Sequence, residues 1–230
     1  MEDVIYYARY VDDIFIIISP RFPKKKVEDY YAEISNIAEY EDFSLKDVGD
    51  NKCSLVDLTI PNVSEKITYL GYTLYIERDN KNKTKVLFGL SEPKKDKIKN
   101  RISKCFASFN ETNKYGIKHA KKRLFLSLRF LTTNTKLTGA KSRVKVGIYF
   151  SNSFLDKEYY RELEEFDDFI KNQELYLYDK IFQNERMQQA CKDNIMSFLI
   201  NNVSFKKGFC NKTYHNFSKS ELKLIKSILR

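Results

Sequence analysis

Two short runs of aromatic and β-branched residues open this chain of 230 residues. Val4 to Tyr10 and Ile14 to Ser19 have the composition of strands, and an Asp-Asp pair between them predicts a β-hairpin. Apolar residues at steps of three and four from Val27 to Ala38 predict an amphipathic helix. Further strands are expected at Phe43–Val48, Ser54–Ile60, Ile67–Glu77 and Lys83–Leu90, the last two joined by the polar turn Arg78–Asn82.

Beyond Ser91 the hydrophobic period becomes helical. Ile98, Ile102, Phe106 and Phe109 would form one apolar stripe of a helix. More helices are expected over Ile117–Leu131, Tyr160–Ile170, Leu175–Ile200 and from Ser218, where Ser218 and Glu221 match a capping box. The pattern predicts an α+β protein with a smaller α/β part, residues 1–90, and a helical part, residues 91–230.

Positive charge is concentrated in one segment of the chain. The whole sequence has 41 Lys and Arg against 31 Asp and Glu, a net charge of +10. From Glu92 to Lys145 alone there are 16 basic and 3 acidic residues, a net charge of +13. An excess this one-sided exceeds what a solvated helix face needs, and it predicts a polyanionic partner, most often nucleic acid.

Composition excludes several classes of protein. With 42% hydrophobic and 14% aromatic residues the chain should fold rather than remain disordered. The longest apolar run, Ile14 to Ile18, is too short to span a bilayer, so no membrane association is expected. The acidic start Met1-Glu2-Asp3 has no secretory pattern, which predicts a cytoplasmic protein. Cys191, Cys210 and His215 do not have the spacing of a zinc finger and lack a fourth ligand.

The sharpest chemical signal is Tyr10-Val11-Asp12-Asp13 in the first hairpin. Adjacent carboxylates repel each other, so a cation is expected beside them. Phosphoryl-transfer enzymes use carboxylates on a rigid element to bind two Mg²⁺ ions about 4 Å apart. Surface turns also favour aspartate, so these four residues alone leave a structural role open.

The wider context of this hairpin resembles a known family. The segment Ile5–Ile16 is similar to the Tyr-x-Asp-Asp hairpin of bacterial reverse transcriptases of the retron and group II intron kind. Further along, Asn51-Lys52-Cys53 looks like the motif D lysine segment, and Tyr69-Leu70-Gly71-Tyr72 looks like motif E, the primer grip. The basic helical part resembles the thumb that holds the template-primer duplex.

This resemblance implies a role for each matching residue. Asp12 would be a metal ligand and Asp13 its supporting neighbour in a two-Mg²⁺ site, while Lys52 would protonate the leaving pyrophosphate or orient the incoming nucleotide. The expected partners are an RNA template with its DNA primer, and deoxynucleoside triphosphates. Nucleic-acid contacts would be made by Tyr10, Leu70, Gly71, Tyr72, Lys94, Lys97, Arg101 and Lys104.

The chain also departs from the family pattern. No segment resembles motif A, which supplies a further metal-binding aspartate, or motif B, whose helix lies against the nucleotide. The resemblance therefore implies the C-terminal part of a right-hand polymerase palm followed by a helical thumb, inactive by itself. Its Mg²⁺ site would be completed by a missing fingers and palm segment or by a second subunit.

Other interpretations of the sequence stay open. The chain could be a non-catalytic nucleic-acid- or protein-binding remnant of that ancestor, or one subunit of a split reverse transcriptase. It could also be an unrelated basic RNA-binding α+β protein with a chance Tyr-x-Asp-Asp, which predicts aromatic residues arranged as a stacking platform. Val146–Asn152 and the acidic helix that follows, Tyr160–Ile170, also resemble the extended thumb of reverse transcriptases in antiphage defence, which would make defence the biological role.

Overall fold

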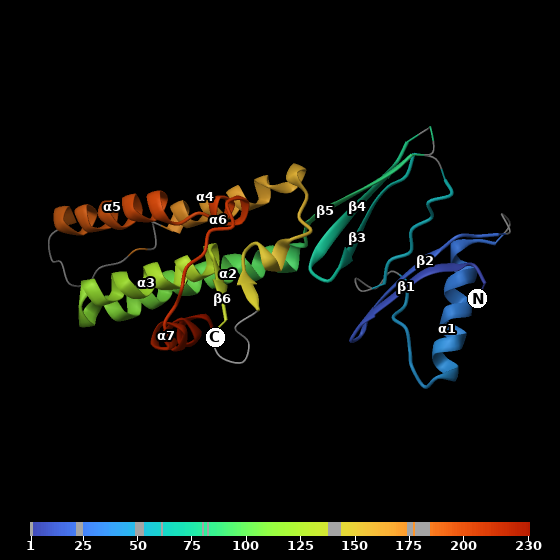
Figure 1. The fold of residues 1–230 in the computed structure, drawn as a ribbon, viewed down its shortest axis with the longest axis horizontal. Coiled ribbons are helices and arrows are strands. Elements are labelled where there is room, and N and C mark those ends of the chain that lie inside the picture. The colour runs from blue at the N-terminus through green and yellow to red at the C-terminus, as the bar shows by residue number, and fades with distance from the viewer. Residues whose placement is uncertain are drawn as a thin grey trace. The chain divides into compact units, whose positions relative to one another are not determined.

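The chain folds as two compact units, Met1–Ser91 and Glu92–Arg230. The computed structural model describes residues 2–21, 25–48, 53–60, 62–79, 81, 83–137, 144–173, 177 and 185–230 (Figure 1). The fold is mixed α+β with small antiparallel sheets, which confirms the predicted class. Along the sequence, the boundary between the two units falls at Ser91 and Glu92, where the hydrophobic period changes from strand-like to helical.

The first unit begins with the predicted hairpin. Strand β1 (Val4–Tyr10) pairs antiparallel with β2 (Asp13–Ile18), and Tyr10 lies opposite Asp13. Helix α1 (Val27–Tyr40) follows, and the buried Tyr30 ties it to the start of β1 by donating a hydrogen bond of 2.6 Å to Asp3. That hydrogen bond, together with burial, raises the pKa of Tyr30 to about 12.

A three-stranded antiparallel sheet completes this unit. Its strands are β3 (Ser64–Tyr69), β4 (Tyr72–Arg78) and β5 (Thr84–Leu90), in that order. The prediction of one strand over Ile67–Glu77 was therefore wrong, because the chain reverses at Leu70 and Gly71. Both residues have positive φ, 48° and 80°, which suits a two-residue hairpin turn. The aromatic and β-branched residues on either side of this turn concealed it.

Two other predicted strands were wrong. Residues Phe43–Val48 and Ser54–Ile60 form no regular strand, although their composition favours one. Local contacts occupy this backbone instead. The Tyr31 hydroxyl donates to the carbonyl of Lys46 at 2.6 Å, and both the amide and the hydroxyl of Thr59 donate to the carboxylate of Asp57. Such local bonds compete with pairing between strands, which needs a partner segment.

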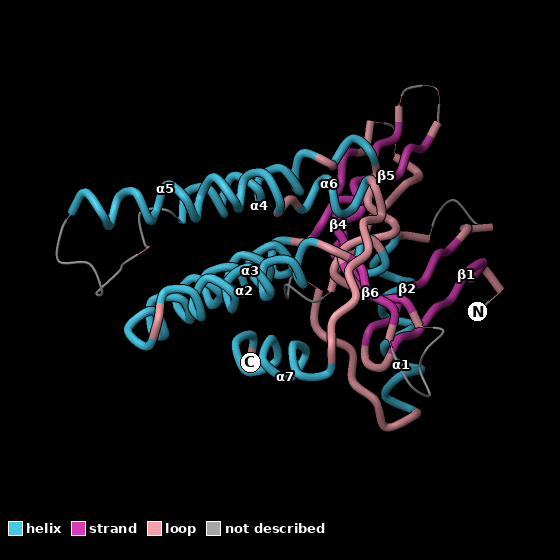
Figure 2. Tube along the Cα trace, turned by 60° about the vertical axis from the view of Figure 1, so that its left-hand side comes forward, coloured by secondary structure: helices cyan, strands magenta, loops and turns pink. Residues whose placement is uncertain are grey.

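The second unit is built on a helical hairpin. Helices α2 (Glu92–Thr112) and α3 (Ile117–Thr132) lie side by side in both views (Figures 1 and 2). Gly116, with φ of 138°, lies at the connection that returns the chain. The predicted stripe is confirmed for Ile102, Phe106 and Phe109, while Ile98 is half-buried. The shared core also contains buried Cys105 from α2 and Ala120, Leu124 and Leu128 from α3.

Shorter elements and three more long helices surround this hairpin. The prediction of a helix over Leu175–Ile200 is confirmed only from Glu185 onward, since residues 174–176 and 178–184 lie outside the described part. The short pair β6 and β7 and helix α6 were not predicted. The elements are β6 (Asn134–Lys136), β7 (Lys145–Gly147), α4 (Arg161–Asn172), α5 (Glu185–Asn202), α6 (Phe205–Cys210) and α7 (Lys219–Leu229).

Helix α7 begins as the sequence predicted. The Ser218 side chain accepts from the amide of Glu221, and the Glu221 carboxylate accepts from the amide of Ser218 at 2.8 Å.

Among the described helices, none combines the length and apolar character needed to cross a membrane.

A buried ion pair joins α2 to α4. The ammonium group of Lys95 lies 2.7 Å from the Glu162 carboxylate and 2.9 Å from that of Glu92, and both Lys95 and Glu162 are buried. Burial lowers the pKa of Lys95, but the hydrogen bonds to Glu162 and Glu92 outweigh that effect and raise it above its usual value. The pair therefore fixes the approach of the two helices by charge as well as by packing.

Removing one member of this pair is expected to destabilise the helical unit. Lys95→Met leaves the buried Glu162 carboxylate facing an apolar group and should lower the free energy of unfolding by about 3–5 kcal/mol. Lys95→Met combined with Glu162→Leu should recover most of that loss, since both charges are gone. Urea unfolding followed by circular dichroism at 222 nm measures these changes.

The control for this experiment is the exposed pair formed by Lys171 and Asp168 at 2.7 Å. Lys171→Met should change the free energy of unfolding by less than about 1 kcal/mol, because water screens this pair. Equal effects of Lys95→Met and Lys171→Met would contradict the structural role of the buried pair.

Candidate functional site

The Asp-Asp pair lies at a turn of only two residues. Val11 and Asp12 connect the strands, and Asp13 is the first residue of β2. All three are exposed, and Tyr10 is 63% exposed beside them. The Arg9 side chain donates to the carbonyl of Val11 at 2.9 Å, which ties the turn back to its own strand. Two adjacent carboxylates are thus presented to solvent on a short, closed hairpin.

The turn holds Val11 in a strained conformation. Its φ is 56°, in the left-handed region that β-branched residues rarely occupy, because the branched Cβ meets the backbone there. A conformation of this kind costs about 1–3 kcal/mol and persists only where the surrounding structure imposes it. Here the ladder between β1 and β2 imposes it, and such strain is characteristic of functional turns.

A second tight hairpin lies next to the first. The ring of Tyr69, at the end of β3, is 5.3 Å from the ring of Phe15 in β2. Burial raises the pKa of Tyr69, and the negative charge of Asp13 raises it further. The structure therefore brings together two segments that the sequence singled out separately, the hairpin end that carries Asp12 and Asp13 and the turn between Tyr69 and Tyr72.

The remaining residues of the second turn differ in accessibility. Leu70 is 43% exposed at the tip, while the ring of Tyr72 packs edge-on against Phe88 of β5 at 6.3 Å. The carbonyl of Gly71 accepts a hydrogen bond of 3.1 Å from the amide of Ser91. Of the predicted contact residues Leu70 and Tyr72, Leu70 is therefore the one that a ligand can reach readily. The ring of Tyr72 instead packs within the sheet.

The donor chemistry of Asp12 and Asp13 suits a hard cation. Carboxylate oxygens are the ligands that Mg²⁺ prefers, and Mg²⁺ requires near-octahedral geometry with several ligands or waters. In the part of the chain that the structure describes, no group of three or more His, Cys, Asp or Glu side chains is gathered in one place. The two aspartates therefore fit a magnesium site but supply only part of its protein ligands. Lys52 lies outside the described residues.

The four predicted basic contacts share one face of α2, at spacings of three, four and three residues, but they differ in environment. The ammonium of Lys94 donates to the carbonyl of Ser151 at 2.9 Å, and burial lowers its pKa to about 8. That of Lys104 donates to the carbonyl of Arg230 at 2.8 Å. Lys97 and Arg101 are exposed. These two remain the better candidates for phosphate contacts.

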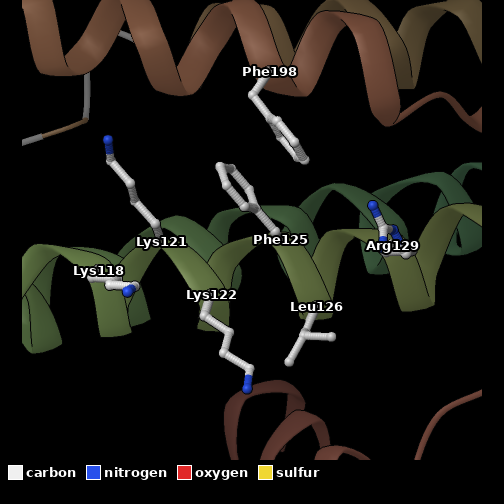
Figure 3. A pocket seen from close by; sticks show the side chains of 7 residues that line it. All are labelled: Lys118, Lys121, Lys122, Phe125, Leu126, Arg129 and Phe198. Atoms are coloured by element: carbon white, nitrogen blue, oxygen red, sulfur yellow. The ribbon is translucent and has the colours of Figure 1, made fainter.

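A second basic face, on α3, was not among the predicted contacts. Lys118, Lys121, Lys122, Phe125 and Arg129 line an open hollow, together with Leu126 and with Phe198 of α5 (Figure 3). Their spacing along α3 follows the helical period, so the signal was present in the sequence. The buried leucines of the same helix follow the same period, and they indicate a packing role for α3 without marking its basic face.

Comparison with known proteins adds no assignment to this geometry. The chain matches no family model, no curated protein and no solved structure.

Relief of the strain at the first turn should be measurable. Val11→Gly removes the Cβ that disfavours positive φ. The relief of strain should exceed the extra conformational entropy that glycine loses on folding, so the hairpin should be stabilised by about 1 kcal/mol in total. Exchange of the β1 and β2 amides with deuterium should slow about fivefold. Val11→Ala is the comparison: it removes the branch but keeps the Cβ, so it should relieve only part of the strain and slow exchange less than glycine does. If the two variants slow exchange equally, the Cβ at positive φ is not the cause.

The lowered pKa of Lys94 predicts a dependence of stability on pH. Below about pH 8 the folded state holds Lys94 charged in a partly buried place, which costs stability. Between pH 8 and the usual pKa near 10.5 the unfolded state binds more protons, so this penalty disappears as pH rises. Lys94→Met has no such penalty at any pH. Its free energy of unfolding, relative to that of the unsubstituted protein, should therefore fall by about 1–2 kcal/mol from pH 7 to pH 10, after allowance for solvent screening. Urea unfolding at each pH measures it, and a constant difference would contradict the assignment.

Proposed function

We propose that this chain is the palm and thumb portion of an RNA-directed DNA polymerase similar to the bacterial reverse transcriptases. The observation that carries the proposal is the pair of exposed, adjacent carboxylates of Asp12 and Asp13 at a strained two-residue turn. The antiparallel ladder is regular from Tyr6 to Tyr10, next to the turn, and it holds these groups in a fixed geometry, as catalysis of phosphoryl transfer requires.

Within this proposal Asp12 is the metal ligand and Asp13 its support. Asp13 begins β2 opposite Tyr10, so the strand ladder restrains it, whereas Asp12 lies on the turn itself. When bound, Mg²⁺ would activate the attacking primer hydroxyl and neutralise charge on the transferred phosphoryl group. The proton delivered to the leaving pyrophosphate remains the proposed role of Lys52.

The neighbouring turn is proposed to position the primer. Leu70 and Gly71, the two turn residues of positive φ, make a sharp reversal of the chain. We propose that the backbone of this turn is where the primer approaches, beside the exposed Leu70. The contact between Tyr69 and Phe15 sets this reversal near the carboxylates within the same unit. A primer lying over Leu70 would present its terminal hydroxyl toward Asp12 and Asp13.

The helical unit is proposed to hold the template-primer duplex. Lys97 and Arg101 lie one helical turn apart on α2 and are both exposed, so they can contact successive phosphates of one backbone. The net charge of +13 from Glu92 to Lys145 provides a long-range attraction to the same partner.

The first sheet leaves room for a further segment. Among the described residues β1 pairs with β2 alone, and its other edge is open. Ile5, Tyr6 and Tyr7 on this strand are 66%, 52% and 55% exposed. An open, apolar edge of this kind favours pairing with another strand. We propose that a strand carrying a further acidic ligand pairs there and completes the magnesium site.

A nucleic-acid-binding protein without catalysis is the second candidate. It is favoured by the absence of a third ligand near Asp12 and Asp13 among the described residues. Under this alternative the exposed cations of α2 would bind duplex, and the carboxylates would serve only the turn.

Primer extension on an RNA template with Mg²⁺ tests the proposal. The full chain should extend no primer by itself, and it should synthesise DNA when combined with the polypeptide encoded directly upstream of its gene. Asp12→Asn should then lower the rate about a thousandfold or more, because a carboxylate that binds the metal directly contributes several kcal/mol to stabilisation of the transition state. Asp13→Asn should have a smaller effect.

Asp42→Asn is the matched control. Asp42 is an exposed carboxylate of the same unit with φ of 55°, a conformation that asparagine accepts readily. Its substitution should leave synthesis unchanged. Synthesis that survives Asp12→Asn would overturn the metal-site assignment, and duplex binding without synthesis in any combination would favour the second candidate.

A further inference from the structure

The hollow on α3 is bounded by two other helices. It has a volume of about 380 Å³, with α5 on one side and α7 on the other (Figure 3). On the α7 side, Leu126 is buried in a cluster with Phe217 and Ile225. On the α5 side, Phe125 meets Phe198. Apolar contacts on both sides therefore hold α3 in place while its central face stays open.

The charges around this hollow are almost all positive. Lys118, Lys121, Lys122 and Arg129 line it, and none of the described lining side chains is acidic. Lys121 donates to the amide oxygen of Asn194 in α5 at 3.2 Å. Glu221 at the start of α7 interacts with one of these cations: its pKa is lowered by its hydrogen bonds to Ser218 and, less, by the charges of His215 and Lys122. The charged side chains that line the hollow are thus all cations.

Two aromatic rings form the centre of the hollow. Phe125 and Phe198 stack with their centroids 4.1 Å apart and their planes at 25°. Neither ring is buried, although each comes from a helix with a well-buried opposite face. A stacked pair of partly exposed rings among four cations offers both flat apolar faces and attraction for phosphates.

We infer that this hollow binds single-stranded nucleic acid, with a base on the rings of Phe125 and Phe198 and the flanking phosphates on the lysines. A duplex would use the cations but not the rings, because its bases are stacked inside. An acidic peptide would likewise leave the rings unused. Unpaired bases have exposed faces that stack on aromatic side chains, and the backbone between them needs cations at short intervals.

This site is separate from the duplex contacts proposed for α2. Lys97 and Arg101 lie on α2, whereas the lining residues belong to α3 and α5. Binding in the hollow requires no metal ion and no nucleotide substrate. Binding in the hollow can therefore be measured whether or not the chain takes part in DNA synthesis.

Fluorescence anisotropy with the full chain tests it. The probes are a labelled oligothymidylate of about ten nucleotides and a blunt duplex of the same length. Phe198→Leu keeps an apolar side chain but removes the aromatic face, and it should weaken binding of the single strand about five- to a hundredfold while leaving duplex binding within about twofold. Equal loss with both probes, or no loss with either, would overturn the inference.

The charged part of the site has its own test. Lys118→Gln combined with Lys122→Gln replaces two exposed lysines, and should lower the slope of log affinity against log salt for the single strand by about 1.4. Lys157→Gln combined with Lys226→Gln is the control, because it removes two charges that are also exposed but do not line the hollow. A control that lowers the slope equally would show attraction by net charge alone.

Two further measurements separate loss of the binding site from loss of the fold and from binding of any polyanion. Circular dichroism checks the fold of each variant, and if Phe198→Leu lowers the folded fraction, the lysine pair at the surface carries the test. Oligoglutamate of similar length serves as a competing polyanion. If it binds as tightly as the oligothymidylate and responds to the same variants, the occupant is an acidic protein segment and the inference is wrong.

Discussion

The packing of α2 against α3 is the interaction on which the rest of the helical unit depends. Ile102, Phe106 and Phe109 of α2 and Leu124 and Leu128 of α3 are almost completely buried in it. A helix that buries one stripe must expose the opposite one, so this seam decides which cations of both helices face solvent. The buried pair of Lys95 and Glu162 then sets α4 against the same hairpin. Both proposed nucleic-acid contacts follow from the orientation that this seam imposes.

The first unit depends on a different constraint, the closure of two hairpins by two-residue turns. Leu70 and Gly71 meet the requirement for positive φ with one glycine, whereas the first turn places Val11 there at a cost. The benefit of the strained turn is geometric, since Asp12 and Asp13 are exposed at the end of the regular ladder that runs from Tyr6 to Tyr10. A site that must collect further ligands from another segment gains from carboxylates already held in position.

Net charge alone would not have distinguished the cations of the second unit. On α2, Lys94 and Lys104 donate to carbonyl groups of the chain itself, while Lys97 and Arg101 face outward. On α3 the cations surround a pair of stacked rings instead. The same excess of lysine and arginine thus serves internal contacts, a proposed duplex contact and a proposed single-strand site, according to what lies beside each residue.

The sequence was enough to predict the elements whose signals are local: the β1–β2 hairpin that carries the Asp-Asp pair, the apolar stripe of α2, and the capping box at Ser218. It could not determine whether Phe43–Val48 finds a strand partner, or that Tyr69 lies beside Asp13, since both depend on segments far apart in the chain. Asn134 and Gly208 show the same limit. The Asn134 side chain binds the carbonyls of Gly208 and Thr213 and the amide of Tyr149, and a Cβ on Gly208 would lie 1.7 Å from the carbonyl of Thr132. These contacts have no periodicity to reveal them, because only the tertiary structure brings their partners together.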